Sequence, residues 1–168
     1  MAAVDPDWRY TNLRYFNVVG SGSDQLYDTS PHNLFPIVFD ALLGGRVPKI
    51  FGDDYQTPDG TCVRDYVHVA DLATSHVAAA QAMVAGRDLG TAYNLGSGDG
   101  SSVAQIMSAI ARVTGIDFTP EIAPRRPGDP ARIVANGDAA ARDLDWQMRH
   151  SLDEMVASAW QARQAHSS

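Results

Sequence analysis

The stretch GTCVRDYVHVADLATSHVAAA, residues 60–80, changes its hydrophobic period part-way along. It begins with the alternation of a β-strand over residues 63–69 and continues with the three-to-four spacing of a helix from about residue 70. Strand side chains alternate between two faces, so we expect Arg64, Tyr66 and His68 to share one face. The other face carries valines and Asp65. The pattern therefore predicts a strand with one face on a core and the other toward a polar partner such as an anion.

The composition is that of a globular protein with one core. The chain has 168 residues, 45% of them hydrophobic, and a net charge of −7. This charge argues against a nucleic-acid or membrane-surface partner. Cys62 is the only cysteine and the N-terminus lacks a signal-peptide pattern, so nothing indicates secretion. No stretch approaches the ~20 apolar residues that cross a bilayer, so we expect a soluble, cytoplasmic protein.

Strands and helices alternate along the chain, which is typical of the α/β class. Strands are expected at residues 12–19, 47–54, 63–69, 91–96 and 118–124. Four helices are expected. The first covers residues 33–43 and is stopped by two glycines, and the second begins at about residue 70 and carries an apolar stripe. The other two begin after residue 102 and after residue 151. The stripe consists of Ala73, Val77, Ala80 and Val84. The last two helices are marked by capping boxes, Ser102–Gln105 and Ser151–Glu154. We expect RRPGDPARIV, residues 125–134, to be a loop, because its prolines and glycine disfavour regular structure.

Two stretches could meet an anion. NLGSGDGSS, residues 94–102, passes from a strand through glycines to a helix start, but it matches neither nucleotide fingerprint. A tight strand-to-helix turn is the favoured interpretation. Adjacent arginines, Arg125 and Arg126, precede a proline, and guanidinium suits phosphate because it is a planar, permanently charged donor. If this loop and Arg64 converge in one cleft, the two sites together would suit a diphosphate.

Five motifs together point to a known family. They are LRYFNVVG, NLFP, IFGDDYQTPDGTCVRDYVHVADLA, YNLGSGDGSSV and APRRPGDPARIVAN. Over about residues 10–160 the chain resembles the C-terminal half of the UDP-glucose 4-epimerase family of extended short-chain dehydrogenases/reductases. The resemblance implies one partial unit, 1–168: a substrate-binding lobe with the last strands of an incomplete Rossmann-like parallel sheet. An N-terminal NAD-binding part is expected to be absent.

The resemblance also implies roles for single residues. Phe16 would lie beside the nicotinamide of NAD, and Ile133 would limit the room near the sugar's C2 substituent. The remaining positions would contact UDP-glucose or UDP-galactose. They are Asn17 as a donor, Asn33 and Leu34 as the floor, Lys49, Ile50 and Phe51 beside the uracil, Arg64 and Arg126 on the diphosphate, and Asp129 on the ribose. Tyr66 and His68 would shape the same cleft.

The family's chemistry needs more than these residues. It uses a Tyr-x-x-x-Lys pair and a glycine-rich dinucleotide loop. The only lysine is Lys49, with Gly45 four residues before it. We therefore expect no catalytic residue and no metal ligand here, and an isolated chain that is inactive without a separate N-terminal half; a homodimer partner is also compatible. The alternative is a stand-alone nucleotide-sugar-binding or regulatory module. A related sugar dehydratase or decarboxylase is disfavoured by DYQTPDGTCVRDYVHV.

Overall fold

Asp65 interrupts the strand that the sequence predicts over residues 63–69. In the computed structural model, which describes residues 9–166, β4 (Val63–Arg64) and β5 (Tyr66–His68) belong to different sheets. The Asp65 side chain is fully buried between them. Its carboxylate accepts bonds from the Ser97 amide at 3.0 Å, the Ser97 hydroxyl at 2.8 Å and the Ala135 amide at 2.9 Å. A buried charge with three donors is well satisfied, and the prediction of one continuous strand is wrong because the chain changes sheets here.

The remaining strands are short and mostly parallel. The predicted strand over residues 12–19 also divides, because Phe16 separates β1 from β2. Parallel pairs join β1 to β6, β2 to β5 and β3 to β8, while β4 lies between β7 and β9. The strands not yet given are β1 (Asn12–Tyr15), β2 (Asn17–Val19), β3 (Lys49–Phe51), β6 (Ala92–Leu95), β7 (Ser101–Ser102), β8 (Glu121–Ala123) and β9 (Arg132–Ile133).

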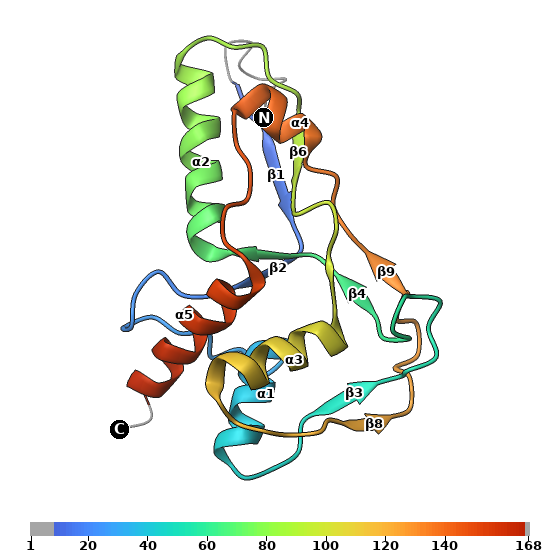
Figure 1. The fold of residues 1–168 in the computed structure, drawn as a ribbon. Coiled ribbons are helices and arrows are strands. Elements are labelled where there is room, and N and C mark those ends of the chain that lie inside the picture. Colours follow the sequence, from blue (N-terminus) through green and yellow to red (C-terminus); the bar gives the residue numbers. More distant parts are fainter. Residues whose placement is uncertain (1–8, 167–168) are drawn as a thin grey trace.

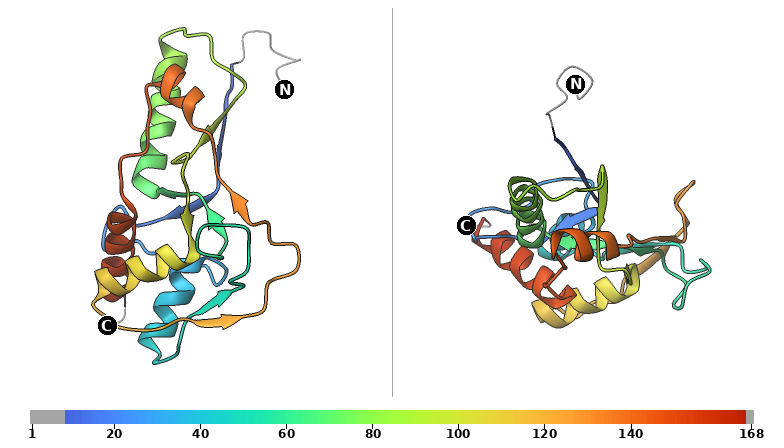
Figure 2. Two further views of the ribbon diagram at one scale, coloured as in Figure 1. Left: turned by 45° about the vertical axis from the view of Figure 1, so that its right-hand side comes forward. Right: turned by 90° about the horizontal axis from the view of Figure 1, so that it is seen from above.

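The helices surround these strands in two groups. In Figures 1 and 2, α2 and α4 lie beside β1 and β6 in the upper part, while α1, α3 and α5 pack together below. Each group has its own apolar cluster, one around Phe39, Ile110 and Trp160 and one around Tyr93 and Leu95. The helices are α1 (Leu34–Leu43), α2 (Val69–Val84), α3 (Val103–Thr114), α4 (Asp138–Leu144) and α5 (Leu152–Ala165).

The predicted helix ends are confirmed where the chain caps itself. Both capping boxes form, at Ser102–Gln105 and Ser151–Glu154, and Gly115 ends α3 in the left-handed conformation with φ 69°. The expectation of a loop over residues 125–134 is wrong in part, because two of its residues form β9 and pair with β4. The sequence pattern did not predict helix α4.

The apolar stripe of α2 faces away from the described core. Val77 is 55% exposed and Val84 is 90% exposed, and Ala73 and Ala80 are exposed beside them. The face that packs inward carries Asp71 and Ser75 with two alanines. Periodicity finds a face of an alanine-rich helix, but it does not identify which face is covered. None of the helices within residues 9–166 is both long and apolar enough to cross a membrane.

Candidate functional site

A cleft of about 380 Å³ opens between α1, β3, β4 and the loop that follows β8. It brings together nine positions singled out from the sequence. They are Asn17, Asn33, Leu34, Lys49, Phe51, Arg64, Tyr66, Arg126 and Asp129. These come from five separate stretches of the chain, so the fold collects them into one concave surface.

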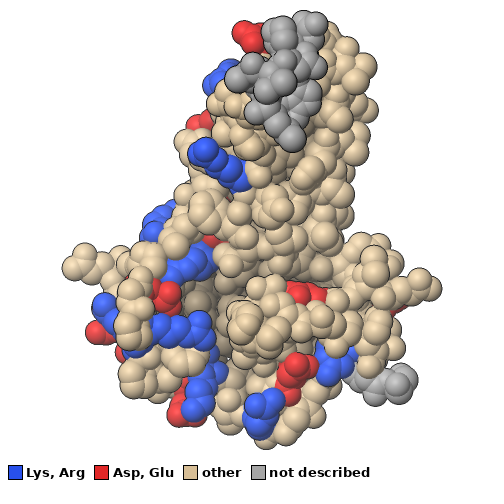
Figure 3. All heavy atoms as spheres, turned by 180° about the vertical axis from the view of Figure 1, so that it is seen from behind, with Lys and Arg blue, Asp and Glu red and all other residues tan. Residues whose placement is uncertain are grey.

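The lining of this cleft is basic. Its charged side chains are Arg46, Lys49, Arg64 and Arg126 against one carboxylate, Asp129. Figure 3 shows basic side chains gathered around a hollow on the side of the molecule that carries β3 and β4. The chain as a whole has a net charge of −7. A local excess of positive charge on an acidic protein favours an anionic ligand at this place.

Arg126 and Asp129 sit at the two ends of one tight turn. The Asp129 amide donates to the Arg126 carbonyl at 3.3 Å, and Gly128 between them has φ 82°. Proline in the second position and a glycine with positive φ in the third are the signature of a type II turn. The Arg126 guanidinium lies 4.0 Å from the centroid of the Phe51 ring. This cation–π contact holds the arginine over the aromatic face in the cleft.

Arg64 is held by its own strand and by the segment that carries this turn. Its Nη1 donates to the carbonyls of Val63 at 2.9 Å and Pro130 at 2.8 Å, and its Nη2 lies 3.6 Å from Asp129 Oδ1. The side chain is only 15% exposed. The two bonds to carbonyls fix one edge of the guanidinium. The Asp129 contact ties Arg64 to the turn that also carries Arg126.

Polar groups from β2, β5 and the start of α1 complete the wall. Asn17 Nδ2 donates to the Asp65 carbonyl at 2.9 Å, which leaves its second N–H and its oxygen for a ligand. Asn33 Nδ2 bonds to Asp28 at 2.5 Å and does not cap α1. Burial raises the pKa of Tyr66 to about 12, with the nearby Arg64 charge acting in the opposite direction. The Tyr66 phenol is therefore a neutral hydrogen-bonding group at physiological pH.

Three candidate residues do not line the cleft. Phe16 lies between β1 and β2 with 44% of its surface exposed. Ile50 is buried in the lower apolar cluster, because side chains alternate along β3 and its neighbours Lys49 and Phe51 take the cleft side. Ile133 is half-buried on β9, in register with Arg64. His68, expected to shape the cleft, caps α2 instead.

Sequence reasoning missed several lining residues. Arg46, Val47 and Pro48 follow the glycines that end α1, and Cys62 and Val103 complete the floor. Arg46 carried a usable signal, since it is a basic residue directly before a predicted strand that holds two candidate residues. No local pattern marked Cys62 or Val103.

A larger hollow lies elsewhere. About 690 Å³ of space opens beside loop 96–99 and the segment 132–148. Its charged lining is one arginine, Arg132, against Asp99 and Asp138, so it does not favour an anion. The glycine loop on its edge makes a local turn in which the Ser97 hydroxyl accepts from the Gly100 amide at 2.9 Å. We therefore place the candidate site in the basic cleft.

Comparisons with known proteins agree on one family. Residues 2–96 match the NAD dependent epimerase/dehydratase family. The chain belongs to this family. It is 44% identical over 156 residues to a UDP-glucose 4-epimerase from Corynebacterium glutamicum, covering 89% of this chain and 46% of that protein. It is 43% identical over 162 residues to a UDP-glucose 4-epimerase from Yersinia pestis, covering 94% of this chain and 48% of that protein.

Solved structures of epimerases superpose closely on the chain. A UDP-glucose 4-epimerase from Stenotrophomonas maltophila, with bound NAD and formylated UDP-arabinopyranose, has a TM-score of 0.89 at 39% identity. It is matched over 99% of this chain and 51% of its own. The Bifidobacterium longum enzyme in complex with NAD+ and UDP has a TM-score of 0.85 at 38% identity, over 98% of this chain and 50% of its own. The chain thus spans about half the length of its relatives, consistent with a C-terminal half and a partial Rossmann-like α/β fold.

Proposed function

We propose that this chain is the UDP-sugar-binding C-terminal part of an NAD-dependent epimerase that interconverts UDP-glucose and UDP-galactose. The observation that carries the proposal is the basic cleft, in which two arginines, an aromatic ring and a carboxylate meet on an otherwise acidic protein. These groups match the parts of a nucleoside diphosphate: charge for the phosphates, a ring face for the base and an acceptor for the ribose hydroxyls. Relatives with the same fold carry UDP or a UDP-sugar.

Different residues bind different parts of the ligand. Arg64 and Arg126 bind the diphosphate, and Asp129 accepts from the ribose. Phe51 meets the uracil together with the backbone of Lys49 and Ile50. A backbone contact at Ile50 is compatible with the buried position of its side chain. Asn17, Asn33 and Leu34 form the surface under the sugar. Ile133, next to Arg64 across the β4–β9 pair, limits the space near the sugar's C2 substituent.

The cofactor is held mainly by a separate N-terminal half. The chemistry that bound NAD would supply is reversible hydride transfer. Of the residues described, Phe16 fits a part in holding it, because an exposed aromatic at a strand end can lie along a flat ring. The chain's own contribution is to bind and orient the nucleotide sugar. A tyrosine–lysine pair for proton transfer would come from the N-terminal half.

Equilibrium dialysis with labelled UDP tests whether the chain binds the nucleotide. The method can be used even if the chain self-associates. The chain should retain UDP at least tenfold more tightly than uridine, since each charge-assisted phosphate contact is worth about 1.5–3 kcal/mol. UDP binding should weaken with added salt. Equal retention of UDP and uridine, or none of either, contradicts the proposal. A binding module without catalysis would bind UDP equally well but gain no epimerase activity when an N-terminal half is supplied.

A further inference from the structure

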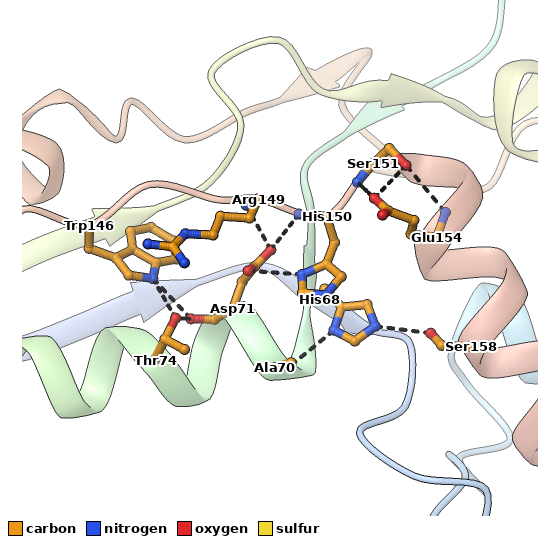
Figure 4. A network of polar contacts seen from close by, with 10 residues as sticks. All are labelled: His68, Ala70, Asp71, Thr74, Trp146, Arg149, His150, Ser151, Glu154 and Ser158. Carbon is orange, nitrogen blue, oxygen red and sulfur yellow. Dashed lines mark hydrogen bonds and ion pairs between the residues drawn. The ribbon is translucent and has the colours of Figure 1, made fainter.

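Two stacked histidines join the upper and lower parts of the molecule. The rings of His68 and His150 have centroids 4.0 Å apart at an interplanar angle of 16°. His68 ends β5 and caps α2, while His150 lies in the segment between α4 and α5 (Figure 4). His68 is 3% exposed, so this contact is part of the interior. Neither ring lines the basic cleft.

The bonds of His68 require a neutral ring. Its Nδ1 accepts from the Ala70 amide at 3.0 Å, so this nitrogen carries no proton. The proton then lies on Nε2, which donates to Ser158 Oγ at 2.9 Å. Ser158 Oγ in turn accepts from the Ser21 amide at 3.1 Å and donates to the Met155 carbonyl at 3.2 Å. Each of these polar atoms has a partner of the right kind in one tautomer, and a second proton on His68 would break the pattern.

His150 has the opposite surroundings. Its Nδ1 lies 2.9 Å from Asp71 Oδ1. The other oxygen of this buried carboxylate accepts from the amides of Arg149 and His150, each at 3.0 Å. These bonds offset the cost of burying Asp71 and hold its pKa below the ordinary range. The Asp71 carboxylate thus faces His150, whereas His68 presents a proton-free Nδ1 to the Ala70 amide.

We propose that His68, His150 and Asp71 form an acid-sensitive latch that joins β5 and α2 to α5 and to the turn after β2. The latch is closed while His68 is neutral. A proton on His68 Nδ1 removes the acceptor of the Ala70 amide and places a cation against the His150 ring. The His68 ring then moves out of its position. The Ser158 hydroxyl, which accepts from the Ser21 amide, loses its bond to the ring. The turn at Ser21 follows β2, which carries Asn17, and β5 carries Tyr66, so one wall of the basic cleft loosens with the latch.

The charged groups around the latch decide the direction of its pH dependence. Burial lowers the pKa of His68, His150 lowers it further, and Asp71 from α2 and Glu154 from α5 oppose the shift. Arg149 is the remaining charged residue of the network. The folded-state pKa thus lies below the ordinary value of about 6.5. The stabilisation is present above this value and is lost as the pH falls from it toward the folded pKa.

Hydrogen exchange measured by mass spectrometry on the full chain tests the latch locally. Protection of the amides of Ser21, Ala70 and His150, corrected for intrinsic exchange, should fall from about pH 6.5 downward by up to about tenfold per pH unit. The variant His68→Asn keeps a capping oxygen but cannot be protonated. It should show lower protection that does not change over this range. His76→Gln, an exposed histidine on α2, is the matched control and should behave as the native chain does.

A second variant keeps the test decisive if His68→Asn does not fold. His150→Asn leaves His68 in place and removes the stacked ring that disfavours its charge. The pH at which protection is lost should then move upward. The latch is wrong if protection in the native chain is unchanged between pH 8 and 5, if His68→Asn follows the native pH profile, or if His150→Asn moves the transition downward.

Discussion

Arg64 and Arg126 both line the cleft, one fixed by main-chain carbonyls and one laid over Phe51. Their replacement by alanine should weaken UDP binding by roughly one to two orders of magnitude, because charge-assisted bonds are worth about 1.5–3 kcal/mol each. Replacement by lysine should restore binding only in part, since an ammonium lacks the two-pronged geometry. Equilibrium dialysis with UDP measures both effects.

A suitable control arginine lies outside the cleft. Arg87 follows α2, and its Nη1 donates to the Asp143 carbonyl at 3.1 Å. Arg87→Ala should leave UDP binding unchanged within a factor of about two, as expected for a contact outside the site. Equal losses for Arg87→Ala and Arg64→Ala would mean that both act through stability, and the diphosphate assignment would be wrong.

Single residues show what the sequence could and could not specify. Arg64 and Arg126 were selected by chemistry and by the family motif, and the fold brings both to one cleft. Ile50 was selected by the same motif, yet its side chain enters the core because neighbours on a strand point to opposite faces. Alternation placed Tyr66 and His68 on the cleft face with Arg64; Tyr66 does line the cleft, but His68 is the last residue of β5 and caps α2 instead. Local periodicity holds only as far as the strand does.

The turn that joins Arg126 to Asp129 makes a prediction at the scale of an element. Gly128 has φ 82°, and a Cβ there would meet no atom within 4 Å. Gly128→Ala therefore adds backbone strain of about 1–2 kcal/mol without a clash. UDP affinity should fall about tenfold, because the turn aligns two ligand-binding residues. The loss of UDP affinity should be smaller for Gly128→Asn, since asparagine tolerates this conformation better.

Gly115 provides the matched control for this substitution. It ends α3 at φ 69°, and a Cβ at this position would also have no atom within 4 Å. Gly115→Ala introduces the same kind of strain away from the cleft, so it should lower stability and leave UDP affinity unchanged. If the two variants lose affinity equally, the turn has no specific part in binding.

Elements were predictable where the chain carries its own start and stop signals. The helices α3 and α5 have capping boxes, and α1 ends at two glycines. Helix α4 has only seven residues, and its N-cap is Gly137, so the sequence lacks a Ser or Asp cap there; the Asp138 amide is instead met by the Asn136 side chain at 2.8 Å. The strands have two to four residues each, and partners distant in sequence decide whether such short segments pair.

At the scale of the whole molecule, the chain spans about half the length of its relatives, and this bears on activity. We expect chain 1–168 to show no conversion of UDP-galactose to UDP-glucose, even with added NAD. Lys49 is its only lysine and no tyrosine stands four residues before it, so the acid/base pair of the family cannot form. A coupled assay for UDP-glucose measures this. Turnover that survives purification to constant specific activity would overturn the assignment of roles between the two halves.

The surface of the upper part predicts how the chain behaves in solution. Within residues 9–166, β1 pairs only with β6, so its other edge offers backbone groups to a further strand. Parallel sheets are normally covered on both faces, yet Tyr15 is 45% exposed and the α2 stripe includes Val84 at 90%.

We expect concentration-dependent association in analytical ultracentrifugation, suppressed by a separately produced N-terminal half. The double variant Val77→Glu and Val84→Glu should reduce association, whereas Leu26→Glu, on an exposed loop, should not. A monodisperse monomer with a sharp, cooperative melt would show that the upper part needs no partner.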